Sequence, residues 1–231
     1  MRTKLAIRLV PFLLGLLSSC VRHTFEPARA ANIVAGTDAA SADVAGIHIV
    51  ADGDAWSGDP ANLEKLLTPV KVTIENHSGD PLRIRYREFS LENSAGLHAA
   101  PLSPFKLSNS TQPAATPITP GFTSDGFYVA PYFQFYGSVL SPWPYEFPFD
   151  NPQGNAYAYW EQSTPDMIAK AIPEGVLSPS GSIAGFLYFP KVAKEVKSVD
   201  FAARLVQARS SQALGAARIP FNRKKLPPLI P

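Results

Sequence analysis

The stretch 70–76 reads Val-Lys-Val-Thr-Ile-Glu-Asn, and apolar and polar residues alternate in it up to Glu75. Alternation with period two places the apolar side chains on one face of a β-strand and the polar ones on the other. A turn-forming cluster occupies residues 76–81, and alternation resumes over 82–86. Two such strands joined by a polar turn form an antiparallel pair with one face in water. The chain is therefore predicted to be mainly β.

The second of these strands contains a break in the alternation. The apolar residues of 82–86 share one face, but the apolar phase resumes at Phe89, one residue out of step. Such a slip predicts a β-bulge near residues 87–88. The opposite face is expected to be a solvated basic stripe, with contact to an acidic partner or lipid headgroups as the alternative. The stripe consists of Arg83, Arg85 and Arg87.

Further elements lie on both sides of this pair. The nearly continuous apolar run 183–189 predicts a central strand that is covered on both faces. Strands are also expected at 47–50, 196–208 and 216–221. Asp59-Pro60 and Thr164-Pro165 each place a capping residue before a proline, which predicts short helices at about 60–67 and 165–171.

Composition excludes several classes of protein. The 23 prolines and 15 glycines among 231 residues argue against a long-helix bundle. A single cysteine excludes an internal disulfide and a multi-cysteine metal site. The formal net charge is +2, which does not suit a basic nucleic-acid binder. No metal, cofactor or nucleic-acid partner is expected.

Residues 1–19 have the composition of a secretory signal peptide. Three cations within residues 2–8 precede the short apolar run 9–17, which is too short to span a bilayer. The run ends in Leu17-Ser18-Ser19-Cys20, which resembles the lipobox of bacterial lipoproteins. The resemblance implies that Cys20 is acylated and becomes the first residue of a membrane-anchored envelope protein. Because residue 21 is Val, the resemblance favours the periplasmic face of the outer membrane. An ordinary signal peptide is the alternative.

Two segments resemble an immunoglobulin-like envelope module. They are 70–96, with its Asn-ended strand followed by Phe-x-Leu, and the Pro-x-Gly strand 177–189; the stretch 164–177 is similar to uncharacterised bacterial lipoproteins. This resemblance implies an antiparallel immunoglobulin-like β-sandwich over 44–222, with two short helices and a long Pro- and aromatic-rich insertion at about 101–162. The lipidated Cys20 and an Ala-rich tether would occupy 20–43, with a reach on the order of 25 Å, and an extended Pro-rich tail would occupy 223–231.

The insertion holds an unusual concentration of aromatic residues. Residues 122–160 contain 14 of the 25 aromatics and neither lysine nor arginine. One interpretation is a flap whose rings pack over the sandwich. Another is an exposed surface that binds an envelope protein, because aromatic residues are enriched at protein interfaces. A third is a platform for a sugar ring. The candidate interaction residues are Trp143, Tyr145, Tyr157, Tyr159 and Trp160.

No catalytic motif is evident in the chain. The four histidines lie far apart, and none has a metal-ligand partner at helical or hairpin spacing. An enzyme would need converging carboxylates, for which the nearest candidates are Glu146, Asp150, Glu161 and Asp166, without a diagnostic spacing. The favoured hypothesis is a non-catalytic, lipid-anchored structural or protein-interaction module, with an envelope carbohydrate-binding module as the alternative.

Overall fold

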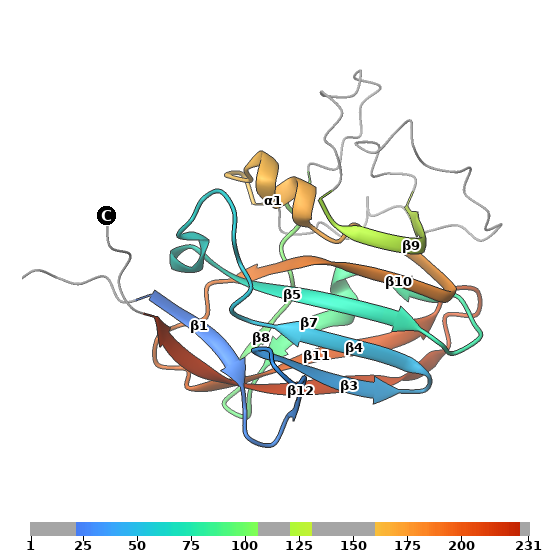
Figure 1. Ribbon diagram of the computed structural model, residues 1–231, viewed down its shortest axis with the longest axis horizontal. Coiled ribbons are helices and arrows are strands. Elements are labelled where there is room, and N and C mark those ends of the chain that lie inside the picture. Colours follow the sequence, from blue (N-terminus) through green and yellow to red (C-terminus); the bar gives the residue numbers. More distant parts are fainter. Residues whose placement is uncertain (1–21, 106–120, 131–159, 227–231) are drawn as a thin grey trace, which may run out of the picture.

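The computed structural model describes residues 22–105, 121–130 and 160–226, which form a mainly β structure (Figure 1). The one α-helix among them is α1 (Pro165–Lys170), and two 3-10 turns are η1 (Leu63–Lys65) and η2 (Tyr86–Glu88). The strands are β1 (Arg22–Pro27), β2 (Asn32–Ile33), β3 (Ala39–Val44), β4 (Ile47–Asp52), β5 (Leu67–Asn76), β6 (Leu82–Ile84), β7 (Phe89–Glu92), β8 (His98–Ala99), β9 (Thr123–Val129), β10 (Gly175–Pro190), β11 (Ser198–Gln207) and β12 (Ala213–Leu226). The mainly β class predicted from the alternation is confirmed, but the two strands expected to pair with each other, β5 and β6, are separated by β10.

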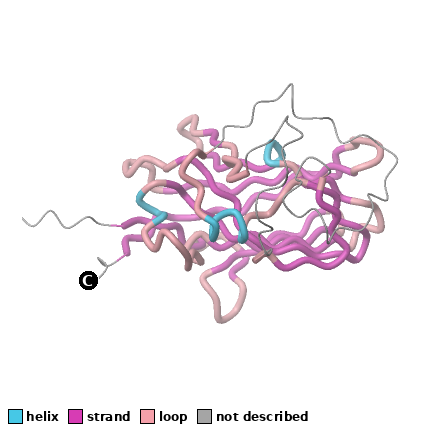
Figure 2. The backbone as a smooth tube through the Cα atoms, turned by 90° about the horizontal axis from the view of Figure 1, so that it is seen from above, coloured by secondary structure: helices cyan, strands magenta, loops and turns pink. Residues whose placement is uncertain are grey.

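All of these strands belong to one sheet that curls on itself. Its order is β1-β12-β11-β6-β10-β5-β4-β3-β2; in addition, β7 pairs with β11, β8 pairs with β7, and β9 pairs with β10. Neighbouring strands pair antiparallel. The curl brings β12 back toward β3, where a Cβ on Gly215 would lie 2.6 Å from Val44 Cγ1. The result is nearly a barrel (Figure 2).

Strand β10 is covered on both faces, as its apolar run predicts. One face looks into the barrel, where Phe189 meets Phe201 of β11 with ring centroids 6.4 Å apart. The other face carries Phe186 and Tyr188, which pack outside the barrel against Trp56. Because two apolar layers meet at one strand, β10 positions the outer elements relative to the barrel.

The expectation of a tether over 20–43 is wrong for the described part of that segment. Residues 22–44 contain three strands, and β1 pairs with β12 over its full length. Phe25 is 3% exposed and belongs to the core. The segment has few large apolar residues, so its alternation is too weak to indicate strands, and its partner β12 lies some 200 positions away.

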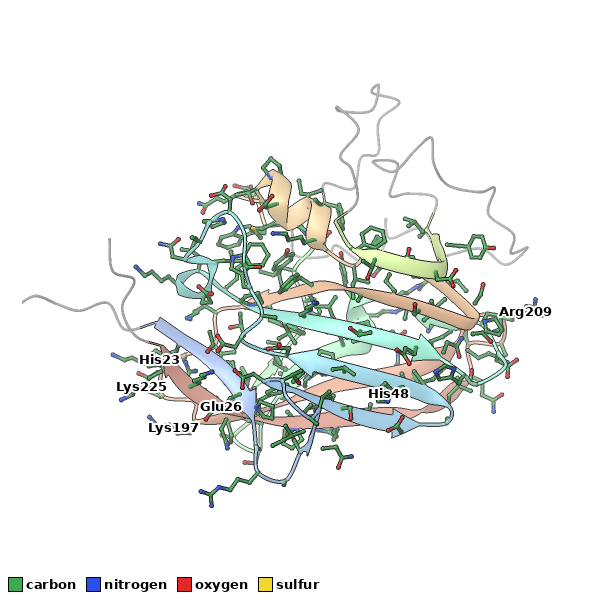
Figure 3. All side chains as sticks on the ribbon, viewed as in Figure 1. His23, Glu26, His48, Lys197, Arg209 and Lys225 are labelled. Atoms are coloured by element: carbon green, nitrogen blue, oxygen red, sulfur yellow. The ribbon has the colours of Figure 1, made fainter. Side chains whose placement is uncertain are left out.

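The C-terminal boundary also differs from the expectation. Strand β12 continues to Leu226, so residues 223–226 pair with β1 and do not belong to an extended tail. Residues 227–231 lie outside the described part. Because Arg22 stands opposite Leu226, the chain enters and leaves the fold at one end. Figure 3 shows His23 and Lys225 at this end and Arg209 at the opposite one.

Strand β1 closes the gap between β12 and β4. The Phe25 N–H donates to the Gly53 carbonyl, with 3.5 Å between N and O. Gly53 permits this approach, since a Cβ there would lie 2.7 Å from the Phe25 oxygen. On the same side, Lys224 Nζ lies 2.8 Å from Asp54 Oδ2 and 3.2 Å from Asp38 Oδ2. The hydrogen bond to Asp54, more than any other contact, raises the pKa of Lys224 above its ordinary value.

The short helices follow the sequence signals in part. Helix α1 forms as expected, and the Thr164 hydroxyl caps it by accepting from the Met167 N–H at 3.3 Å. The helix expected at 60–67 is only the 3-10 turn η1, and Asn62, not Asp59, precedes it. Asp59 instead donates its N–H to Asp166. The phase slip at 87–88 is accommodated by the 3-10 turn η2, not by a β-bulge.

We expect Phe25→Ala to lower the free energy of unfolding by about 3–5 kcal/mol, because it opens a cavity where β1 closes the barrel. Glu26→Ala, at the exposed neighbouring position, should change it by no more than about 0.5 kcal/mol. Denaturant unfolding of both variants measures the difference. Equal, small effects would show that residues 22–27 do not belong to the cooperative fold.

Candidate functional site

Most of the residues expected to form the interaction surface lie outside the described part of the chain. These are Trp143, Tyr145, Tyr157 and Tyr159, and Cys20 lies outside it as well. Trp160 is described. Its side chain is partly buried and packs against the core, and its backbone N–H donates to the Ser103 carbonyl at 3.1 Å. One candidate ring is therefore bound to the fold and is not freely exposed.

The two ends of the aromatic segment are attached to the fold near β10. On the N-terminal side, Phe122 and Phe127 are partly buried and pack against the core. Ala130, where the described part pauses, donates its N–H to the Glu174 carbonyl at 2.8 Å. On the C-terminal side the described part begins again at Trp160 and leads into α1. For the described aromatics at these ends, the flap interpretation fits the packing.

An aromatic cluster on the outer face of β10 supports these ends. The Trp56 ring meets Phe186 and Tyr188 nearly edge-on, with centroids 5.1 and 5.8 Å apart. Its Nε1 donates to the Pro60 carbonyl at 3.0 Å. The Tyr188 hydroxyl donates to the Met167 carbonyl at 3.0 Å, which joins α1 to the cluster. Pairs of rings in this geometry stabilise by more than their buried area alone.

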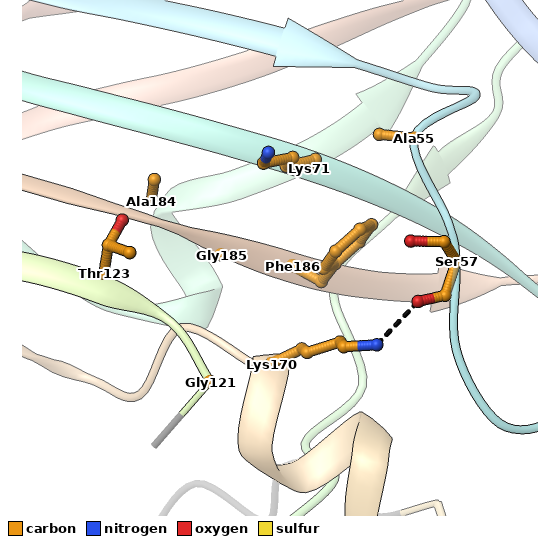
Figure 4. Close-up of a pocket in the computed structure, with 9 residues that line it drawn as sticks. All are labelled: Ala55, Ser57, Lys71, Gly121, Thr123, Lys170, Ala184, Gly185 and Phe186. Atoms are coloured by element: carbon orange, nitrogen blue, oxygen red, sulfur yellow. Dashed lines mark hydrogen bonds between the residues drawn. The ribbon is translucent and has the colours of Figure 1, made fainter.

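A small open pocket of about 240 Å³ lies beside this cluster (Figure 4). Lys170 borders it from α1, and its ammonium donates to the Ser57 carbonyl at 2.6 Å and lies 3.3 Å from Asp166 Oδ2. The same ammonium lies 5.3 Å from the centroid of the Trp56 ring. The lining residues are Ala55, Ser57, Lys71, Gly121, Thr123, Lys170, Ala184, Gly185 and Phe186.

The pocket offers donors rather than acid–base chemistry. Its described lining holds two ammonium groups and two hydroxyls, and these residues include no carboxylate, imidazole or thiol. A small anionic or polar group is the ligand chemistry that such a lining suits. Gly185 has no side chain, which lets β10 approach the end of α1 beside the pocket: a Cβ there would lie 2.8 Å from the Lys170 carbonyl oxygen.

Two of the four carboxylates considered for catalysis, Glu161 and Asp166, lie in the described residues. Glu161 is exposed. Asp166 accepts from the Asp59 N–H at 3.0 Å, and this bond, followed by Lys170, lowers the pKa of the Asp166 carboxyl. Glu146 and Asp150 lie outside the described residues. Within the described ranges, no cluster of three or more His, Cys, Asp or Glu residues could hold a metal ion.

The expected basic stripe is not a solvated face. Glu88 is almost fully buried, and its carboxylate accepts from Arg83 Nη2 at 2.8 Å and from Arg204 Nε at 2.7 Å. Arg85 is only 3% exposed. The turn η2 therefore places Glu88 where it pairs with Arg83 and Arg204, whereas Arg87 remains exposed at the edge of the stripe. The hydrogen bond to Glu88 raises the pKa of Arg204.

Comparisons of the chain with protein-family models, with curated proteins and with solved structures found no match. Among the helices of the described residues, none has the length and apolar character needed to cross a membrane.

We expect Lys170→Met to lower the free energy of unfolding by about 1–2 kcal/mol, because it removes the charged donor that ties α1 to Ser57. Lys71→Met, on the other side of the pocket, is the matched control and should cost no more than about 0.5 kcal/mol. Amide exchange should accelerate in 55–59 and 165–170 for the first variant only. Equal protection in both variants would contradict a positioning role for Lys170.

Proposed function

We propose that the chain is a lipid-anchored protein of the bacterial cell envelope with a non-catalytic, interaction-based role. The observation that carries this proposal is the place of the Leu17–Cys20 motif, which lies directly before strand β1 (Arg22–Pro27). The first described strand begins at Arg22, two positions after Cys20 of the Leu17–Cys20 motif. Cleavage before Cys20 would thus leave every described strand intact, and the cysteine would become the N-terminal residue, directly before the curled sheet.

The proposed anchor acts without a long tether. Residues that would have formed the tether are paired in β1 and β3, so acylation at Cys20 would hold the barrel itself against the lipid. A bacterial signal of this kind supports attachment to the periplasmic face of the outer membrane, and several acyl chains anchor stably where a single one is marginal.

A non-catalytic role is supported by the chemistry of the described ionisable groups. Glu88 and Asp166 are each engaged by arginine or lysine. His48 lies 2.7 Å from Asp43, and His98 lies 3.3 Å from Glu92. These groups are engaged by neighbouring side chains of the fold, Glu88 in its interior and the others nearer its surface.

We propose the aromatic segment as the recognition element, with another envelope protein as its partner. The segment is attached at both ends next to Trp56 and α1, which gives it a rigid base. An envelope glycan is the second candidate, because aromatic rings among amide and carboxylate side chains suit a sugar. An exposed pair of Trp143 and Trp160 would favour the glycan, and the packing of Trp160 against the core counts against it.

We further propose that residues 70–96 and 177–189 correspond to an immunoglobulin-like envelope module. The support is that these residues form the strands β5, β6 and β7 and most of β10, with β10 paired to both β5 and β6. The single curled sheet would make this a merged variant of a two-sheet sandwich. An experimental structure with strands in two separate sheets would favour the plain sandwich.

Native purified protein is expected to begin at Cys20 and to carry acyl chains, as measured by intact-mass and N-terminal peptide spectrometry. Cys20→Ala should retain residues 1–19 and lose the acyl mass, because the thiol receives the lipid. Ser19→Ala keeps a small residue and should be processed normally. An unmodified cysteine, or a mature chain that begins elsewhere, would refute the anchor.

A photo-crosslinking amino acid at position 143 should give a discrete protein adduct in the native envelope, because exposed aromatic residues concentrate at interfaces. The same probe at position 209, at one end of the barrel, is the control. A glycan adduct would put the carbohydrate-binding role first. Crosslinks confined to the chain itself would mean that the segment is a flap, and would refute recognition through it.

A further inference from the structure

The end of the barrel where β1 begins and β12 ends carries a concentration of positive charge. The loop 191–197, between β10 and β11, contributes three exposed lysines, and β12 contributes the exposed Lys225. Figure 3 shows Lys225 near His23 and Lys197, whereas Arg209 lies at the opposite end of the molecule. The charges come from two segments, the loop 191–197 and the last residues of β12, so only the fold brings them together.

The contacts of these cations leave most of their charge unbalanced. Arg223 donates to the Val196 and Ala193 carbonyls, each at 2.6 Å, and Lys191 donates to the Glu64 carbonyl. These acceptors are neutral backbone carbonyl groups, which orient a cation without neutralising its charge. The carboxylates of this end are those of Glu64 and Glu195.

The electrostatic effect of this cluster is visible at His23. Burial lowers the pKa of the His23 imidazole first, and the positive charges of Arg223 and Lys191 lower it further. Lys225 and Lys197 act in the same direction. Further along β1, Glu26 is the next carboxylate. The end of the barrel therefore has a positive potential, which attracts anions.

The position of this end relative to Cys20 suggests the anion. Only Val21 separates Cys20 from Arg22, and consecutive Cα atoms are about 3.8 Å apart, so the two residues are at most about 8 Å apart. Charges within about 8 Å of each other are incompletely screened at physiological ionic strength. An acyl chain on Cys20 would therefore place these cations within reach of phospholipid headgroups.

We propose that this basic end of the barrel docks on anionic phospholipids, so that the barrel stands with the turn 208–212 directed away from the membrane. We call it the basic end, formed by Lys191, Lys194, Lys197, Arg223 and Lys225. The inference rests on the proposed acylation of Cys20, which brings this surface to the bilayer. It adds an orientation and a lipid class to the anchor.

The test compares two photo-crosslinking positions in the full-length chain. Ser198 is exposed beside Lys197, and Gln212 is exposed at the far end of β11 and β12. After irradiation in the native membrane, a probe at position 198 should give at least about tenfold more phospholipid adduct than one at 212, since a ten-residue strand spans about 33 Å. Equal lipid adducts, or a protein adduct in place of lipid at 198, would overturn the docking.

The charge dependence is tested with the acylated chain reconstituted in vesicles. Adducts from position 198 should be about threefold or more abundant in phosphatidylcholine vesicles with one-third phosphatidylglycerol than in phosphatidylcholine alone. Combined Lys194→Gln, Lys197→Gln and Lys225→Gln should abolish this difference. The matched triple variant Arg29→Gln, Lys71→Gln and Arg209→Gln removes three exposed cations outside the basic end and should retain it. An unchanged yield in all vesicles would overturn the electrostatic docking.

The mass of the N-terminal peptide from the same preparations separates the two proposals. An acylated Cys20 with no lipid adduct at 198 refutes the docking and leaves the anchor. Lipid adducts at 198 with an unmodified Cys20 refute the anchor and leave a surface that binds anionic lipid by itself. Neither signal refutes both.

Discussion

The double coverage of β10 is the constraint on which the rest of the structure depends. Its residues 175–177 pair with β6, which continues through β11 to β12, and residues 182–190 pair with β5, which continues to β4 and β3. The one strand therefore belongs to both walls of the barrel. Because its outer face is apolar as well, it requires a second layer, which Trp56 and α1 supply. The pocket beside Lys170 and the attachment of the aromatic segment both follow from that layer.

Local signals in the sequence predicted the elements whose pattern is complete within a few residues. The alternation of 70–75, the apolar run of 183–189 and the Thr164 cap each correspond to an observed element. The failures share a different cause. Strand β1 contributes little apolar surface, and residues 223–226 of β12 are polar or charged up to Leu226 and were expected to form an extended tail. Each of these segments is ordered through pairing with the other. The burial of Arg85 is missed because the 3-10 turn η2, which a period-two pattern does not reveal, follows it directly.

The candidate site also depends on contacts between residues far apart in the sequence, which local patterns do not reveal. The pocket combines residues 55–57, 71, 121–123, 170 and 184–186, and these have no shared motif or spacing. Trp56 is central to the outer layer, yet in the sequence it stands among turn residues without periodic neighbours. Cys20 stands out as a lipidation candidate in the sequence because the pattern that suggests it, a leader followed by small residues, is local. Chemistry that depends on tertiary contacts leaves no such local signal.

Barrel closure and membrane attachment involve the same strand. Strand β1 joins β12 to the end of β4 through Phe25, and on the proposed anchoring it is also the strand tied to the lipid. A frayed β1 in a free chain gains the conformational entropy of its released residues. Anchoring Cys20 restricts that released state, and docking of the cations around Lys225 restricts it further. The membrane would thus favour the closed barrel without adding a contact to its core, in the same way that a cross-link stabilises a fold through its open state.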